Sequence, residues 1–153
     1  MSVWQAMNTA ATGLSSQRTR LDVIANNIAN ADTTRRSDGK AGPYRKQRVI
    51  FEPRNNPIRF HLPLIKGSDI GNDPGTGVHI TKVTEQDGPV PWKYMRYEPD
   101  HPDANEEGYV MYPDVDIVTE MVDMIDASRA YEASVTVMRD FRSMWSEALK
   151  IGT

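Results

Sequence analysis

Proline is confined to the middle of this 153-residue chain, and this constrains the fold more than any other feature of the sequence. All ten prolines lie between Pro43 and Pro113. Because proline has no amide hydrogen and its ring clashes with the preceding helical turn, it ends or kinks a helix. Long helices are therefore possible only at the two ends of the chain. We expect three segments: a helical segment over residues 1–34, a β-rich unit over 35–113 and a second helical segment over 114–153.

Both terminal segments carry apolar residues at seven-residue intervals. On a helix this spacing makes a narrow apolar seam, which is stable only when another helix covers it. We therefore expect an α+β fold, in which the two helices pair in a coiled-coil-like bundle and a small antiparallel β-rich unit is inserted between them. The packing residues expected on the first helix are Val3, Met7, Ala10, Leu14, Leu21, Ile24, Asn27 and Ile28. Those expected on the second helix are Ile117, Met121, Met124, Ser128, Tyr131, Val135, Met138, Trp145 and Leu149.

Residues typical of helix ends mark both predicted helices. Ser2 and Gln5 have the spacing of a capping box, in which each side chain bonds a free amide of the first turn. We expect this helix to end near Ala31. Asp114 is the expected N-cap of the second helix, and Gly152 stands where a helix usually stops.

Three asparagines, Asn26, Asn27 and Asn30, lie near the end of the first predicted helix. Asparagine is a weak helix former, so this concentration is unusual. The side chains are either tolerated surface polarity or hydrogen-bonding groups that fix the register between packed helices. The sequence favours neither reading.

The middle segment differs in character, since it holds all the prolines and eight of the ten glycines. Short runs rich in β-branched and aromatic residues alternate there with turn residues, which is typical of strands. Residues 98–108 are acidic and rich in turn formers, and we expect them to form an exposed loop. The expected strands cover residues 44–51, 58–65, 76–84, 91–97 and 109–112.

Composition excludes several classes of function. The chain has no cysteine, so it can form neither a disulfide nor a thiolate metal site. Its net charge of -3 argues against binding nucleic acid through a general basic field. We interpret the basic run over residues 35–48 as a solvated face, with contact to an acidic partner surface as the alternative. No stretch is apolar for the ~18–20 residues that a membrane-spanning helix needs. The first residues also lack the pattern of a secretory signal, so any export would follow a leaderless route.

No arrangement of residues indicates catalysis, a metal or a cofactor. The three histidines, His61, His79 and His101, have no metal-binding or catalytic spacing. The glycines at 71, 75 and 77 lack the lysine that follows a phosphate-binding loop, and we interpret them as a turn. The acidic residues between 100 and 107 do not have the spacing of an EF-hand, which favours a solvated loop over a calcium site.

Two longer motifs resemble a known family. The run LDVIANNIANADTT over residues 21–34 resembles the N-terminal signature of the flagellar rod, hook and hook-filament axial proteins. The run GYVMYPDVDIVTEMVDMIDASRAYEA over residues 108–133 is similar to their C-terminal signature. The short chain is most similar to the proximal-rod members of this family. It departs from the pattern at Asp114 and Ser134, where the family usually has Asn, and again late in the last helix.

The resemblance implies a structural subunit of the bacterial flagellar basal body, with no enzymatic activity and no cofactor. Such a subunit is exported through the flagellar type III apparatus without a cleaved signal. It assembles through its terminal helices with copies of itself and with other rod subunits, and it transmits torque across the periplasm. The alternative is a self-contained periplasmic binding module, in which the two helices form an intramolecular hairpin and the β unit recognises a ligand.

Overall fold

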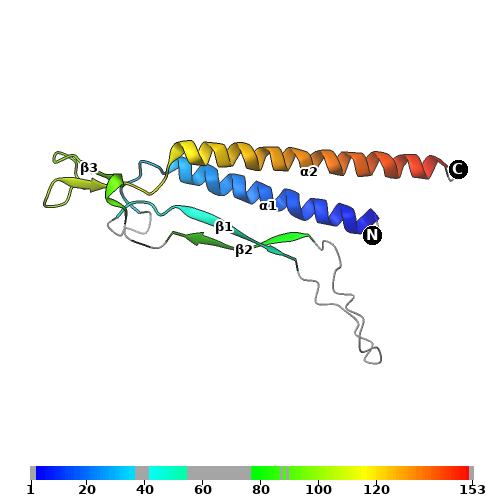
Figure 1. The fold of residues 1–153 in the computed structure, drawn as a ribbon, viewed down its shortest axis with the longest axis horizontal. Helices are drawn as coiled ribbons and strands as arrows, with labels where there is room; N and C mark the ends of the chain where they lie inside the picture. The colour runs from blue at the N-terminus through cyan, green and yellow to red at the C-terminus, as the bar shows by residue number, and fades with distance from the viewer. Residues whose placement is uncertain (1–2, 37–41, 55–76, 87, 89, 152–153) are drawn as a thin grey trace, which may run out of the picture.

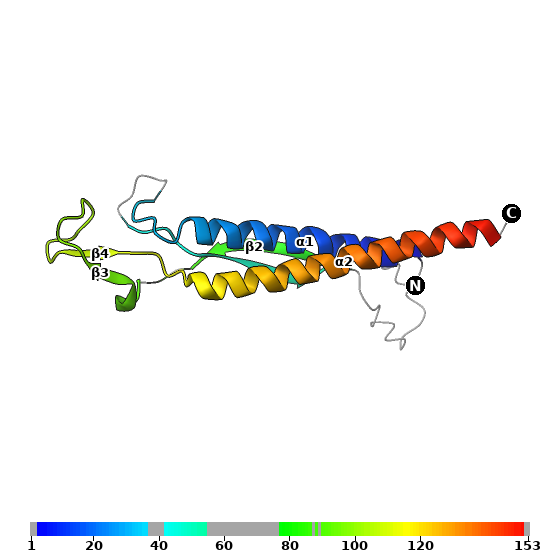
Figure 2. The same cartoon turned by 90° about the horizontal axis from the view of Figure 1, so that it is seen from above.

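The molecule is elongated and is built around two long antiparallel helices (Figure 1). The computed structural model describes residues 3–36, 42–54, 77–86, 88 and 90–151. Helices α1 (Val3–Ala29) and α2 (Ile117–Ile151) contain 27 and 35 residues, which correspond to lengths of about 40 and 52 Å. They lie side by side in both views, and both chain ends are at the same end of the molecule (Figure 2). The prediction of a long helix at each end is confirmed.

Small residues let the two helices approach closely. A Cβ atom placed on Gly13 of α1 would lie 3.8 Å from Oγ of Ser134 on α2, an ordinary van der Waals distance. Ala127 is fully buried on α2. The helices thus contact each other along most of α1, as an intramolecular pair.

The starts and ends of the helices differ slightly from those expected. Helix α1 ends at Ala29 rather than near Ala31, and a turn follows it. The N-cap of α2 is Asp116, so the prediction of Asp114 was wrong. Oδ1 of Asp116 accepts hydrogen bonds from the amides of Val118 at 3.0 Å and Thr119 at 3.4 Å. The expected capping box at the start of α1 includes Ser2, which lies outside the described residues.

Asp114 is occupied elsewhere, which explains why it does not cap the helix. Its Oδ2 accepts a 2.7 Å hydrogen bond from Nε2 of Gln86. A tight turn, in which the amide of Val115 donates to the carbonyl of Pro113 at 2.8 Å, then leads to the helix start. The cap position therefore falls two residues later than the sequence suggested.

The strands form two separate antiparallel pairs rather than the single β unit that was expected. Strands β1 (Gln47–Pro53) and β2 (Val78–Glu85) pair alongside α1, with a bulge between Ile50 and Phe51. A 3-10 turn, η1 (Trp92–Tyr94), leads into β3 (Met95–Tyr97), which pairs with β4 (Tyr109–Met111) at the far end of the molecule (Figure 1). The expected strand over 58–65 lies outside the described residues.

Proline accounts for the break between the two sheets. Pro91 precedes η1 and Pro113 follows β4, and neither residue can donate a ladder hydrogen bond. Each strand of the second pair is only three residues long. The pair is anchored to the rest of the chain by its connections and by Val110, which is fully buried.

The apolar core is small for a chain of this length. In the described ranges the buried apolar residues are Val23, Ile24, Ala31, Val110, Val115 and Ala127, together with Pro43 and Pro113. Many larger apolar side chains on α2 are exposed. Within these same ranges, neither helix is long and apolar enough to cross a membrane.

Candidate interaction surfaces

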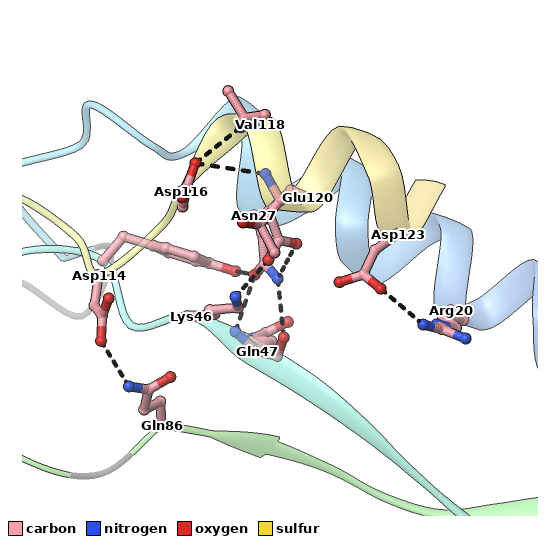
Figure 3. A network of polar contacts seen from close by, with 12 residues as sticks. Arg20, Asn27, Lys46, Gln47, Gln86, Asp114, Asp116, Val118, Glu120 and Asp123 are labelled. Atoms are coloured by element: carbon pink, nitrogen blue, oxygen red, sulfur yellow. Dashed lines mark hydrogen bonds and ion pairs between the residues drawn. The ribbon is translucent and has the colours of Figure 1, made fainter. Parts of the chain in front are cut away.

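A buried polar cluster joins the two helices to the start of β1 (Figure 3). Asn27 on α1 is buried, and its side chain makes all four hydrogen bonds of which an amide is capable. Nδ2 donates to the carbonyl of Gln47 at 2.9 Å and to Oε2 of Glu120 at 3.1 Å. Oδ1 accepts from the amide of Gln47 at 2.9 Å and from the hydroxyl of Tyr44 at 3.0 Å. Of the two readings that the sequence left open for these asparagines, hydrogen bonding across the helix pair holds for Asn27.

The neighbouring asparagines do not share this role. Nδ2 of Asn30 donates to the carbonyl of Asn26 at 2.9 Å, within the same stretch of chain, and the Asn26 side chain is exposed. Asn27 differs because its position on α1 faces both α2 and β1.

A buried ion pair completes the cluster. Nζ of Lys46 lies 2.5 Å from Oε1 of Glu120, and the Glu120 side chain is only 2% exposed. Burial raises the pKa of the nearby Tyr44 hydroxyl, and the negative charges of Glu85 and Glu120 act in the same direction. Removing one partner of a buried pair leaves the other charge unsatisfied, so such pairs hold elements in one specific arrangement.

A second polar contact holds β2 against α1. The amide of Val78 donates to Oγ1 of Thr12 at 3.2 Å. Gly77, the preceding residue, has a φ of 94°, and a Cβ atom there would overlap the Thr12 hydroxyl. Only glycine fits without strain. Sequence reasoning identified Gly77 merely as a turn residue, because nothing in the local sequence indicates that a helix passes so close.

The expected packing residues occupy three different environments. Ile24 and Asn27 are buried. Ile117, Met121, Trp145 and Leu149 are exposed. The side chain of Val3 lies outside the described part of the structure. The others are half-buried between the elements: Met7, Ala10, Leu14, Leu21, Ile28, Met124, Ser128, Tyr131, Val135 and Met138.

Helix geometry explains why the second helix has exposed seam residues. A straight helix drifts by about 20° per heptad relative to a strict seven-residue repeat. A row of heptad positions along 35 residues therefore rotates away from a fixed partner. In addition, α2 extends past the start of α1, so the last positions of the row have no helix to cover them (Figure 1).

The first turns of α2 carry an exposed apolar patch, which we call the outer patch. It consists of Val118, Met121, Val122 and Ile125, whose side chains are 52–72% exposed. The spacing i, i+3, i+4, i+7 places all four on one face of the helix. Sequence reasoning found only Met121, although the same spacing in the sequence could have revealed the other three.

The residues considered for chemistry do not converge on a site. His79 is exposed on β2, and Nδ1 of His101 accepts a hydrogen bond from the amide of Asp103 at 3.1 Å. His61 and the glycines at 71 and 75 lie outside the described residues. Within the described ranges, no group of three or more acidic or histidine side chains is arranged to hold a metal ion.

One carboxylate of the acidic loop has a structural role. Asp103 accepts hydrogen bonds from Nε of Arg35 at 2.6 Å and from Oγ1 of Thr34 at 2.8 Å. The Arg35 hydrogen bond and then the Thr34 bond lower the pKa of Asp103. The contact ties the loop to the segment that follows α1.

The N-terminal and C-terminal helical segments each match a known protein family. Residues 7–35, which contain most of α1, match a family described as flagella basal body rod protein. Residues 106–151, which contain β4 and α2, match the family described as flagellar basal body rod FlgEFG protein C-terminal. The fold thus joins the two halves of a flagellar axial protein in one helical pair.

Whole-chain relatives narrow the class. Proteins named flagellar basal-body rod protein FlgC from Borreliella burgdorferi, Bacillus subtilis and Escherichia coli O6:H1 are 45%, 38% and 36% identical to this chain. The matches cover 99% of the chain and 98–99% of each relative. The chain belongs to the FlgC family of flagellar basal-body rod proteins, which confirms the resemblance seen in the sequence. The relatives and the family models support a structural subunit of the flagellar basal-body rod.

Proposed function

We propose that this rod protein assembles through its terminal helices with copies of itself and with other rod subunits, and that the assembly transmits torque across the periplasm. The observation that carries the proposal is the outer patch on α2, together with the half-buried seam residues. The single chain buries few apolar side chains. Contact with neighbouring subunits would bury more of them and would stabilise the assembly. Family membership further supports export through the flagellar type III apparatus.

The expected packing residues fit this proposal in two groups. The half-buried ones, such as Leu21 and Met124, border the contact between α1 and α2, and a neighbouring helix could cover their remaining surface. The exposed ones, such as Met121 and Trp145, face away from α1 or project past it. We propose that neighbouring helices complete the packing into a coiled-coil-like bundle.

The self-contained binding module is the alternative, and one observation favours it. It requires an intramolecular helical hairpin, and α1 and α2 do pair within the chain. The outer patch argues against this alternative. A contiguous apolar patch exposed on a protein surface marks an interaction site, and a module that works alone has no partner to cover it. If the protein assembles into the rod through the outer patch, disrupting the patch should abolish motility. If the protein is a self-contained binding module, disrupting the patch should leave motility intact.

Substituting the outer patch tests the assembly proposal. Val122→Asp places a charge on an exposed position, so the isolated chain should keep its circular dichroism spectrum and melting temperature. In a strain lacking its own copy of the gene, we expect this variant to be non-motile because its subunits fail to enter the rod. Thr136→Asp is the matched control, since Thr136 is exposed on the same face of α2 beyond the patch. Full motility of the Val122→Asp strain would contradict the proposal.

A further inference from the structure

The β3–β4 sheet presents an apolar outer face at the end of the molecule. Met95 pairs with Met111 and Tyr97 with Tyr109, and residues two apart on a strand point to the same side. These four side chains therefore form one face, which we call the tip face, and they are 37–65% exposed. The opposite face carries Val110, which is fully buried.

The tip face is preorganised rather than loose. The rings of Tyr97 and Tyr109 pack edge to face with centroids 5.3 Å apart. Gly108 has a φ of 82°, and a Cβ atom there would lie 2.9 Å from the Tyr97 ring, so glycine is needed for this packing. Oδ1 of Asn105 accepts hydrogen bonds from the amides of Glu107 and Tyr109 at 3.1 and 2.8 Å, which shapes the loop. A rigid surface loses little entropy when a partner binds.

An open groove runs along one side of this face. Tyr109 and Met111 line this groove together with Arg35, Pro43 and Pro102, and the polar side chains of Thr34, Asp103 and Asn105 line it as well. An elongated amphipathic partner, such as a helix with an apolar stripe and charged flanks, suits a groove with this mixed lining.

The end of α2 has the properties of such a partner. Residues 137–150, which we call the α2 tail, place Val137, Phe141, Met144, Trp145 and Leu149 along one stripe of the helix. Of these, all but Phe141 are 43–59% exposed. The stripe continues the face that packs on α1 in the rest of the helix.

The α2 tail projects beyond its own partner helix. Gly13 lies against Ser134, and Asn27 bonds Glu120. The same antiparallel spacing places the start of α1 opposite Met144. The turns that follow, with Trp145 and Leu149, therefore extend past α1, as Figure 1 shows.

One flank of the tip face and one flank of the α2 tail are also complementary in charge. Residues 98–108, beside the tip face, contain five carboxylates and no lysine or arginine. Three of these side chains are exposed: Asp100, Glu106 and Glu107. The α2 tail exposes Arg139, Arg142 and Lys150 on one side of its apolar stripe, and Asp140 and Glu147 on the other side. Opposite charges around an apolar contact orient the partners and suppress wrong pairings.

The tip face and the α2 tail lie at opposite ends of the molecule in both views, so they cannot meet within one copy (Figures 1 and 2). We infer that they meet between copies: the tip face of one subunit binds the α2 tail of a second subunit. Such a head-to-tail contact joins two different surfaces and can repeat without closing. The inference rests on the proposed function, since it names the surface that covers the exposed end of α2.

Two complementary variants of the full chain test the inference. Tyr97→Asp damages the tip face and leaves the tail intact, whereas Trp145→Asp damages the tail and leaves the tip intact. Each variant alone should lose concentration-dependent association in analytical ultracentrifugation, with an association constant at least about 30-fold below that of the unchanged chain, as for the loss of an aromatic anchor. Met95→Asp, on the same face as Tyr97, should repeat the result.

Mixing the variants gives the decisive result. A one-to-one mixture of Tyr97→Asp and Trp145→Asp retains one intact tip and one intact tail, so we expect dimers that do not grow further. Three results would each overturn the inference. The mixture could stay monomeric, either variant alone could associate as strongly as the protein without substitutions, or the protein without substitutions could stay monomeric at about 1 mM. Val122→Asp should associate like the unchanged chain in this assay, which separates the tip contact from the outer patch. Loss of motility in Val122→Asp together with a failed mixing test would leave the proposed function standing without this contact.

Discussion

The buried ion pair between Lys46 and Glu120 allows a quantitative test of what holds the β1–β2 pair against α2. Lys46→Met removes the cation and leaves the Glu120 carboxylate with its hydrogen bond from Asn27 but without a balancing charge. Breaking a buried pair by removing one partner costs about 3–5 kcal/mol. The remaining Asn27 bond places our expectation at the lower end, about 3 kcal/mol.

Urea unfolding followed by circular dichroism measures this cost. With a slope of about 1–3 kcal/mol/M, the midpoint should fall by roughly 1–3 M. Arg20→Met is the control, because the Arg20–Asp123 pair also joins a cation to a carboxylate on α2, but its side chains are 34% and 42% exposed. Pairs exposed to this degree contribute about 0–1 kcal/mol.

The double variant Lys46→Met/Glu120→Met completes the cycle. Because two methionines leave no buried charge, the double variant should recover most of the stability lost in Lys46→Met. Two results would refute the reasoning: a Lys46→Met cost no larger than that of Arg20→Met, or a double variant less stable than Lys46→Met alone.

Two further predictions concern single backbone and cap positions. Gly77→Ala should destabilise the chain by at least about 1 kcal/mol, because the new Cβ would overlap Thr12 and residue 77 has a positive φ. Adding Thr12→Ala to this variant should restore part of the lost stability in urea unfolding. If it restores none, the contact between residues 12 and 77 is contradicted. The amides of Thr119 and Val118 lower the pKa of Asp116, so its ionised form stabilises the fold above the unfolded pKa of about 3.9. That contribution is lost as the pH falls through the lower folded pKa, so Asp116→Asn should be less sensitive than the unchanged chain to acid between pH 5 and about 2 in urea titrations. An identical acid dependence of the two proteins would rule out this cap.

The sequence by itself determined that each end of the chain is a long helix, and it determined the class of protein. The absence of proline from both ends and the heptad spacing predicted two long helices, because these are local properties of the backbone and of the helical repeat. The two signature runs over 21–34 and 108–133 identified the family. Four of the expected strands were also found near their predicted positions, since β-branched runs between turn residues are likewise local signals.

The tertiary structure decided how these elements meet. Asn27, Lys46 and Glu120 are far apart in the sequence, and only the folded chain shows that they form one cluster. The choice of Asp116 over Asp114 as the helix cap followed from a contact between Asp114 and Gln86.

The separation of the strands into two sheets and the exposure of the tip face and the α2 tail were also decided at this level. Each of these outcomes depends on free energies of contact between distant segments. Periodicity along the chain reports which face of an element is apolar, but the side that becomes covered depends on the three-dimensional path of the whole chain.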